Sequence, residues 1–293
     1  AHDFDLFVIG GGSGGVRAAR MAAGRGARVA LAETLGTDGL GGTCVNVGCI
    51  PKKLYSYAAH YADAFEESHG FGWEGEKPSF NWATLKANRA KEISRLNGVY
   101  ANLLRGSGVT VINGFARIDG PHAVTVATLN ADGSPGHQSF TAANILIATG
   151  GTPFVPHFVG REHVITSNEV FDLDPFPQRL LVAGGGYIAC EFASIFNGLG
   201  SKVTQLYRGE QVLRGFDDEI RHFVASEMQK TGVDLRLNAG VVDIRKTDGG
   251  LRAELEDGNI VMADAVLYAT GRKPNVQGPV SYTHLTLPTS DLV

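Results

Sequence analysis

The chain has 293 residues, 43% of them hydrophobic, with 26 lysines and arginines against 30 aspartates and glutamates. This length favours about two domains, each with its own core, and the hydrophobic fraction argues against disorder. The net charge of −4 leaves no basic excess for nucleic-acid binding. No apolar run approaches the roughly 18 residues that cross a bilayer, and the start of the chain lacks a signal-peptide pattern. We therefore expect a cytoplasmic protein in which any pair among the three cysteines is redox-active.

A βαβ unit is predicted at the start of the chain. An apolar run at 6–9 leads into a glycine-rich turn, a helical stretch extends to about Gly24, and a second apolar run at 28–32 ends at Glu33. The glycines have the G-x-G-x-x-G spacing that lets a backbone turn approach a pyrophosphate, and an acid 23 positions after the first glycine suits a ribose hydroxyl. The turn residues expected to bind this dinucleotide are Gly10, Gly12, Ser13, Gly14 and Gly15.

A second copy of this unit begins at residue 180. Its turn contains Gly184 and Gly186 in G-x-G-x-x-A spacing, followed by a helical stretch and a strand at 202–206. The position equivalent to the acid of the first copy is Tyr207, and Arg208 follows it, with Arg214 a short loop later. Because a guanidinium pair binds a 2′-phosphate that a carboxylate would repel, this copy predicts NADP(H) rather than NAD(H). The alternative is that both arginines are merely solvated.

The internal duplication extends beyond the two glycine-rich turns. After each βαβ unit come alternating, hairpin-like strands, at 115–126 and 241–262, and then a buried strand ending in Ala-Thr-Gly, at 145–150 and 266–271. Duplication at this scale predicts an α/β protein with two Rossmann-like FAD/NAD(P)-binding domains, each with a parallel sheet and a β-meander. We place the first domain at 1–151 and the second at 152–275. One cofactor could be a flavin dinucleotide and the other a nicotinamide dinucleotide.

The first copy carries a long insertion that opens with Gly-Gly-Thr-Cys-Val-Asn-Val-Gly-Cys-Ile-Pro-Lys-Lys, residues 41–53. Cys44 and Cys49 are five positions apart, a spacing that a regular helix does not align, so joining them requires a distorted turn that Gly48 and Pro51 favour. A strained disulfide in a short loop is easy to reduce, as a redox relay requires. The alternatives are two reduced core thiols, or a metal site, which would need further cysteines or histidines nearby.

With these motifs the chain resembles the pyridine nucleotide–disulfide oxidoreductases, and most closely the members that reduce glutathione disulfide. The resemblance covers residues 4 to about 275 and implies FAD and NADPH as cofactors. It implies that Cys49 lies against the flavin and that Cys44 attacks the substrate disulfide. It also implies that Lys53 pairs with Glu191 near the flavin and that Tyr187 forms a lid over it. Further cofactor contacts implied by the resemblance are Glu33, Gly42, Thr43, Ala116, Thr149, Gly150, Ile188, Gly271 and Arg272.

The resemblance also bears on the substrate. Lipoamide dehydrogenases usually have Pro-Ser-Lys where this chain has Pro-Lys-Lys, and trypanothione reductases have an acid and a tryptophan where this chain has Arg17 and Arg20. Arg20 and Tyr100 are therefore expected to contact glutathione disulfide. Thioredoxin reductases of the large type need a C-terminal redox pair that this sequence lacks. A reductase of the thioredoxin or trypanothione type remains the alternative.

The sequence departs from the family pattern after residue 275. In the family, the chain returns to the flavin domain after this point and then forms an interface domain, and the segment 276–293 resembles neither part. His284 lacks the residues that surround the family's catalytic histidine. We expect a chain that stops before the interface domain, and the homodimer of full-length members is not assured for it. Weak flavin retention and little turnover of glutathione disulfide are expected. A non-catalytic cofactor-binding remnant is the alternative from a different class.

Overall fold

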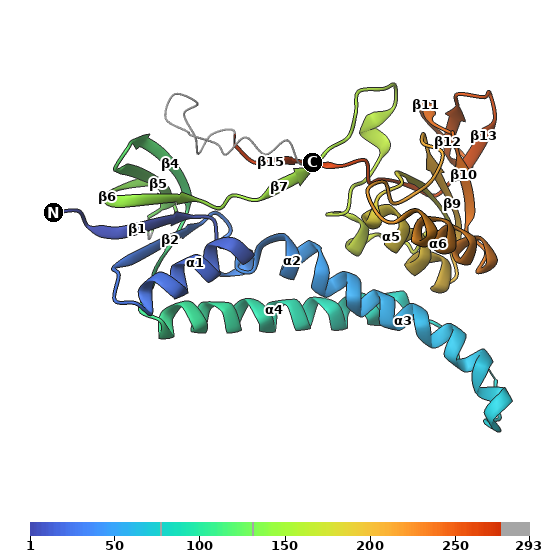
Figure 1. Ribbon diagram of the computed structural model, residues 1–293, viewed down its shortest axis with the longest axis horizontal. Helices are drawn as coiled ribbons and strands as arrows, with labels where there is room; N and C mark the ends of the chain where they lie inside the picture. The colour runs from blue at the N-terminus through green and yellow to red at the C-terminus, as the bar shows by residue number, and fades with distance from the viewer. Residues whose placement is uncertain (77, 131, 277–293) are drawn as a thin grey trace. The chain divides into compact units, whose positions relative to one another are not determined.

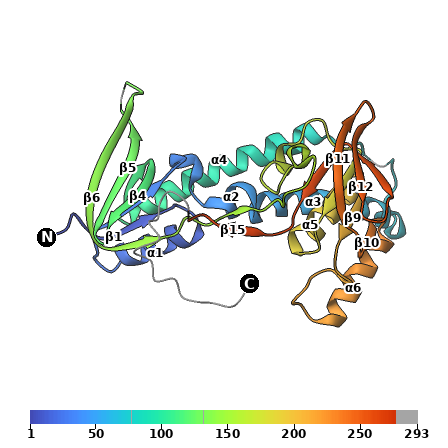
Figure 2. The ribbon, with the colours of Figure 1, turned by 90° about the horizontal axis from the view of Figure 1, so that it is seen from above.

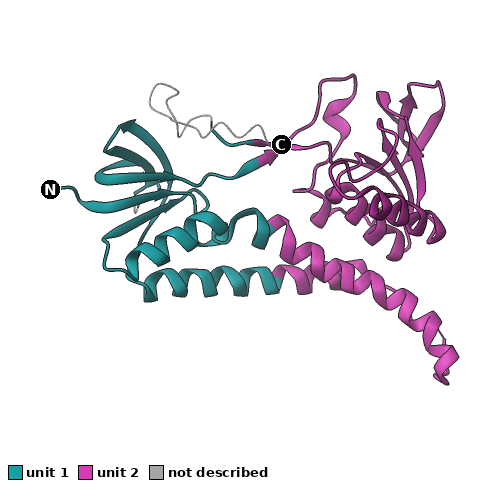
Figure 3. Cartoon of the chain, in the orientation of Figure 1, with its two compact units in different colours: residues 1–46, 91–151, 274–293 teal, residues 47–90, 152–273 magenta. Residues whose placement is uncertain are grey.

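The computed structural model describes residues 1–76, 78–130 and 132–276, so the departure predicted for the end of the sequence lies almost wholly outside the described residues. The chain divides into two compact units (Figure 3). The first unit comprises residues 1–46, 91–151 and the described residues from 274 onward, and the second comprises 47–90 and 152–273. The segment 47–90, which we placed in the first domain, is therefore grouped with the second by its packing.

The first unit is built on one six-stranded sheet with the order β3-β2-β1-β6-β5-β4 (Figure 1). Its strands are β1 (Phe4–Ile9), β2 (Val29–Glu33), β3 (Thr110–Asn113), β4 (Phe115–Gly120), β5 (Ala123–Leu129) and β6 (Pro135–Ile147). Its helices are α1 (Ser13–Ala23) and α2 (Gly42–Val47), together with the C-terminal part of α4 (Trp82–Gly106).

The long strand β6 joins the parallel and antiparallel parts of this sheet (Figure 2). Residues 135–141 pair antiparallel with β5, and residues 142–147 pair parallel with β1. Side chains of β1 alternate between two apolar clusters: Phe7 packs with the meander strands, whereas Val8 packs with Val16 and Ala19 of α1. Strand β1 is thus packed between the meander on one side and α1 on the other.

The second unit repeats this plan with two separate sheets. A parallel sheet has the order β10-β9-β8-β14, and an antiparallel meander has the order β11-β12-β13. The elements of the parallel sheet layer are β8 (Arg179–Ala183), α5 (Tyr187–Gly198), β9 (Lys202–Tyr207), α6 (Asp218–Lys230), β10 (Asp234–Leu237) and β14 (Ala265–Tyr268). The meander strands are β11 (Val241–Thr247), β12 (Gly250–Leu255) and β13 (Ile260–Ala263), and the short strands β7 (Gly151–Pro153) and β15 (Arg272–Pro274) pair with each other. The prediction of two Rossmann-like units, each with a parallel sheet and a meander, is confirmed.

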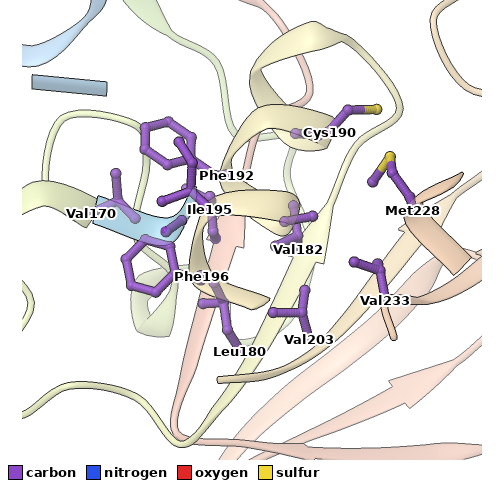
Figure 4. Close-up of a cluster of buried hydrophobic side chains, with 14 of the residues drawn as sticks. Val170, Leu180, Val182, Cys190, Phe192, Ile195, Phe196, Val203, Met228 and Val233 are labelled. Carbon is purple, nitrogen blue, oxygen red and sulfur yellow. The ribbon is translucent and has the colours of Figure 1, made fainter. Parts of the chain in front are cut away.

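Helix α3 (Cys49–Ser68) belongs to the second unit because it packs on α5. Tyr55 of α3 is fully buried and donates a hydrogen bond from its hydroxyl to the carbonyl oxygen of Phe171, 2.7 Å away. The aromatic cluster around it includes Phe192 and Phe196 of α5 (Figure 4). Among the described helices, none is both long and apolar enough to cross a membrane.

Candidate functional site

The first glycine-rich turn has the close backbone approaches that its spacing predicts. Gly10 has a φ of +106°, and a Cβ placed on it would lie 2.4 Å from the carbonyl oxygen of Ala148. A Cβ on Gly15 would lie 1.9 Å from the carbonyl oxygen of Gly10, so α1 can begin here only without a side chain. A Cβ on Gly14 would meet nothing within 4 Å, which leaves open space beside the start of α1. This turn fits the backbone-lined anion site of a dinucleotide.

Glu33 lies beside this turn, as its position in the sequence predicts. Its Oε2 accepts a hydrogen bond from the backbone N–H of Gly11 at 2.7 Å, and its Oε1 accepts one from the N–H of Leu35 at 3.2 Å. A Cβ on Gly39 would lie 2.4 Å from Oε1, so the loop before α2 also closes on this carboxylate. Glu33 therefore fixes the turn, and its role toward a ribose hydroxyl stays a prediction.

The Gly41-Gly42 sequence that precedes the first cysteine is explained by main-chain contact with the glycine turn. The N–H of Gly41 donates to the carbonyl oxygen of Gly11 at 2.8 Å, and a Cβ on Gly42 would lie 2.6 Å from the Cα of Gly12. Both Gly41 and Gly42 have positive φ, +89° and +59°. The insertion is thus joined directly to the dinucleotide-binding turn.

Two asparagines that the sequence analysis gave no role hold this loop in place. Asn97 of α4 is buried, and its Nδ2 donates to the carbonyl oxygen of Leu40 at 2.8 Å and to Oδ1 of Asn46 at 3.0 Å. Asn46 in turn donates from Nδ2 to the carbonyl oxygen of Gly42 at 2.9 Å. The only signal in the sequence was the position of Asn46 inside the cysteine motif, because Asn97 is 51 residues away from it.

The chain is not one continuous helix between the two cysteines. Cys44 lies in α2, and Cys49 is the first residue of α3. Gly48 separates the helices with φ −146° and ψ −118°, which are not helical angles. Pro51 falls in the first turn of α3, where a missing N–H costs no helical hydrogen bond. The distorted turn required for a Cys44–Cys49 disulfide is therefore present, and the disulfide itself stays a prediction.

The prediction that Lys53 pairs with Glu191 is wrong, because Lys52 occupies that place. Lys52 Nζ lies 2.7 Å from Glu191 Oε1. Lys53 instead places its Nζ 4.6 Å from the centre of the Tyr57 ring, on the exposed side of α3. The two lysines are about 100° apart around the helix, so although both line the cleft beside α5, Lys52 is the one that reaches Glu191.

The second glycine-rich turn has the geometry of the first. Gly184 has a φ of +142°, and a Cβ on it would lie 2.3 Å from the carbonyl oxygen of Ala269. Gly186 is the N-cap of α5, and a Cβ on it would meet nothing within 4 Å. Tyr187, the first residue of α5, is 57% exposed. The turn is therefore open to a ligand at the N-terminus of an α-helix, where an anion is favoured.

Tyr207 takes the place in the second copy that Glu33 takes in the first. A Cβ on Gly185 would lie 2.3 Å from the Tyr207 ring, just as a Cβ on Gly11 would lie 3.0 Å from Glu33 Oε2. Arg208 and Arg214 follow on the exposed surface, and within the described part of the chain no ion pair involves either of them. An aromatic ring in place of a carboxylate, together with two guanidinium groups that form no ion pair among the described residues, suits a phosphate in this region.

A cleft of about 540 Å³ runs between α3, α5 and α6 in the second unit. Lys52, Glu191 and Tyr187 line one part of it, and Ala59 and Met228 line its apolar part. Cys190 also lines it but is only 5% exposed, and burial raises the pKa of its thiol. Gln205 donates from Nε2 to the sulfur at 3.5 Å and to the carbonyl oxygen of Gly184 at 3.0 Å. The neutral, buried Cys190 thiol is suited to packing rather than to exchange.

The remaining predicted residues are distributed over both units. Arg20 is exposed and donates to Ser107 Oγ at 3.4 Å, and Tyr100 packs partly buried against an apolar cluster of the first unit. Thr149 donates from Oγ1 to the carbonyl oxygen of Asn275 at 2.6 Å, so the described end of the chain returns to the first Ala-Thr-Gly. Ser13 and Ile188 lie at the starts of α1 and α5, and Thr43 and Ala116 lie in α2 and β4. Gly150 directly precedes β7, and Gly271 directly precedes β15, which begins at Arg272.

Comparison with known proteins agrees with this arrangement. A glutathione reductase of Burkholderia cepacia is 51% identical over 277 residues, which cover 94% of this chain and 59% of the relative. A glutathione reductase of Nostoc sp. is 43% identical with 58% of its length covered, and a trypanothione reductase of Leishmania donovani is 40% identical with 57% covered.

Among solved structures, the HOCl-induced flavoprotein disulfide reductase RclA from Escherichia coli matches with a TM-score of 0.80 at 29% identity, covering 94% of this chain and 58% of that chain. The chain thus spans less than two thirds of the length of these relatives. The family model described as pyridine nucleotide-disulphide oxidoreductase matches residues 4–290. The chain therefore belongs to the pyridine nucleotide-disulphide oxidoreductase family.

Proposed function

We propose that the protein to which this chain belongs is an NADPH-dependent flavoprotein disulfide reductase that acts on glutathione disulfide. The observation that carries the proposal is the Lys52–Glu191 pair. It joins the helix that begins at Cys49 to the helix that begins at the second glycine turn, with Nζ and Oε1 2.7 Å apart. Lys52 lies one helical turn after Cys49, and Glu191 lies one turn after Tyr187. Cys49, Lys52 and the second glycine turn therefore lie in the same unit.

The residues of each glycine turn fit their cofactors. Backbone N–H groups around Gly12 and the start of α1 would hold the FAD pyrophosphate, and those around Gly186 would hold that of NADPH. Arg208 and Arg214 would bind the 2′-phosphate. When bound, FAD supplies a centre that takes a hydride from NADPH and returns two electrons to a disulfide. The Lys52 ammonium would stabilise the negative charge that develops there, and Glu191 would hold that ammonium in place.

The two cysteines would perform the exchange with substrate. Reduction of the Cys44–Cys49 disulfide gives two thiols, and the Cys44 thiolate then attacks one sulfur of glutathione disulfide and releases the first glutathione thiolate. Cys49 attacks the mixed disulfide at Cys44, releases the second glutathione and re-forms the starting disulfide. Two electrons and two protons enter, and two thiols leave. Arg20 and Arg17, exposed on α1, suit the carboxylates of glutathione. NADPH supply and redox-active thiols favour the cytoplasm.

The test is an anaerobic titration of the FAD-supplemented chain with NADPH, followed by visible absorption. We expect a long-wavelength thiolate-to-flavin band that Cys49→Ser abolishes and that Cys44→Ser, the matched control, retains. Binding of both cofactors with no such band would refute the reductase proposal and leave a nucleotide-binding protein without chemistry. Turnover with glutathione disulfide, compared with trypanothione disulfide, lipoamide and thioredoxin, then decides the substrate.

A further inference from the structure

Helices α3 and α5 touch at two points that are spaced identically along both helices. The first is the Lys52–Glu191 pair, with Nζ and Oε1 2.7 Å apart. The second lies seven residues later on each helix, where a Cβ placed on Gly198 would lie 2.9 Å from the Cβ of Ala59 and 3.4 Å from its carbonyl oxygen. Seven residues are close to two helical turns, so both contacts lie on the same face of each helix. The two helices therefore run in the same direction in one fixed register.

The backbone at Gly198 does not itself require glycine. Residue 198 ends α5 in helical conformation, and the C-cap Leu199 has right-handed angles, φ −79° and ψ −6°. The first left-handed residue is Gly200, with φ +106°. Glycine within a helix is less favourable than alanine. The close approach of Ala59 is the feature of the described structure that accounts for a glycine at this position.

We propose that Gly198 is a positioning residue for the Lys52–Glu191 pair: its missing side chain lets α3 lie close enough to α5 for the two charged groups to meet. Carbon atoms in contact normally lie 3.5–4.0 Å apart, so a methyl group at 198 would require a displacement of about 1 Å. Tyr55 lies between the two contacts, fully buried and hydrogen-bonded to Phe171, so α3 cannot move away freely along its length. Pushing Ala59 away from α5 would therefore tilt α3 about Tyr55 and move Lys52 out of its position against Glu191.

This inference relies on the proposed function only for its catalytic consequence. The register of the two helices is a property of the chain alone, and it can be measured without either cofactor. Lys52 and Glu191 are 26% and 39% exposed, which lets a small water-soluble carbodiimide reach them. The reagent condenses a lysine amine with a touching carboxylate, forming an amide with loss of water, so the yield of the cross-linked peptide reports the contact.

The experiment compares carbodiimide cross-linking of the 293-residue chain with that of Gly198→Ala, quantified by peptide mass spectrometry. The Lys230–Glu227 pair of α6, 2.6 Å apart, is the internal control in every sample. We expect the Lys52–Glu191 product to fall by roughly threefold or more, because a hydrogen bond stretched beyond 3.5 Å is lost. The Lys230–Glu227 product should not change.

Two further variants keep the test decisive. Ala59→Val adds bulk from the α3 side of the same contact and should cause the same loss, whereas the double variant Ala59→Gly/Gly198→Ala removes the opposing methyl group and should restore the product. Wild-type cross-linking in folded Gly198→Ala or Ala59→Val would overturn the proposal, as would failure of the double variant to recover. If the cross-linked product falls in Gly198→Ala as expected but the wild-type chain shows no NADPH-dependent reduction, only the proposed function is contradicted.

Discussion

Lys52 Nζ and Glu191 Oε1 lie 2.7 Å apart in the cleft between α3 and α5, although the residues are 139 positions apart in the sequence. Both side chains are partly exposed, at 26% and 39%, so the pair contributes at most about 1 kcal/mol to stability. Because this contribution is small, the position of the pair next to Cys49 and the second glycine turn is better explained by a role in catalysis than by a role in folding.

Exchange of Lys52 for methionine separates this explanation from a structural one. Lys52→Met removes the ammonium that we propose stabilises charge on the flavin, so we expect reduction of the FAD-loaded chain by NADPH to slow by about tenfold or more. The free energy of unfolding should change by no more than about 1 kcal/mol. Stopped-flow absorption and urea unfolding measure the two effects. Lys53→Met is the matched control and should leave the rate unchanged; a rate that depends on Lys53 instead would contradict the assignment.

Replacement of Tyr207 tests how the second site selects its nucleotide. Tyr207→Glu places a carboxylate where Glu33 lies in the first copy, beside the region of Arg208 and Arg214. Repulsion of the 2′-phosphate should weaken binding of adenosine 2′,5′-bisphosphate by about tenfold, which corresponds to about 1.4 kcal/mol. Binding of 5′-AMP should change little. Calorimetric titration measures both ligands, with Tyr207→Phe as the control that keeps the ring. Equal weakening of both would indicate damage to the turn rather than selection.

The glycine turns were predictable because their requirements are local. Gly10 and Gly184 need positive φ, and Gly15 cannot carry a side chain beside the Gly10 carbonyl oxygen. Such requirements are met within a few residues, so the spacing alone indicates the turn. The duplicated meanders and Ala-Thr-Gly strands were predictable for the same reason.

The choice between Lys52 and Lys53 was not predictable from spacing. It depends on which side of α3 faces α5, and the buried Tyr55 and Ala59 set that side through contacts with Phe171 and Gly198, each more than 100 residues away. The grouping of 47–90 with the second unit has the same cause. Trp82 donates from Nε1 to the carbonyl oxygen of Leu173 at 2.7 Å, a contact between segments that no local pattern connects.

We predict that Asn97 contributes to FAD binding as much as the residues of the cysteine motif do. Asn97→Ala removes two hydrogen bonds and leaves the buried carbonyl oxygen of Leu40 and Oδ1 of the half-buried Asn46 without that donor, which should destabilise the fold by about 1–3 kcal/mol. The loop that contacts the first glycine turn should also loosen, so the affinity for FAD should fall. Urea unfolding and fluorescence titration with FAD measure these effects.

Asn102 provides the control on the same helix. Its side chain is exposed and accepts a hydrogen bond only from Arg105 among the described residues. Asn102→Ala should change the free energy of unfolding by less than about 0.5 kcal/mol. If Asn97→Ala were equally mild, the loop would have to be held by Gly41 and Gly42 alone.

The buried Tyr55 should make the stability of the protein depend on alkaline pH. Burial raises the pKa of Tyr55 to about 12, with the nearby Arg89 lowering it in part. In the unfolded chain the pKa is about 10. Below pH 10 the hydroxyl is protonated in both states and its contribution is fully present. As the pH rises from about 10 to about 12, the unfolded chain loses this proton first, so about 2–3 kcal/mol of stability is lost.

Tyr55→Phe separates the effect of Tyr55 on stability from that of every other group that titrates at alkaline pH. At neutral pH the variant should be less stable by about 1 kcal/mol, because the hydrogen bond to the Phe171 carbonyl oxygen is lost. As the pH rises from about 10 to about 12, only the wild type loses the Tyr55 contribution, so the wild-type advantage should vanish and then reverse. Tyr268, whose pKa burial also raises, is present in both proteins and cancels. Urea unfolding at a series of pH values measures the difference, and a constant difference up to pH 12 would show that water reaches the Tyr55 hydroxyl in the folded protein.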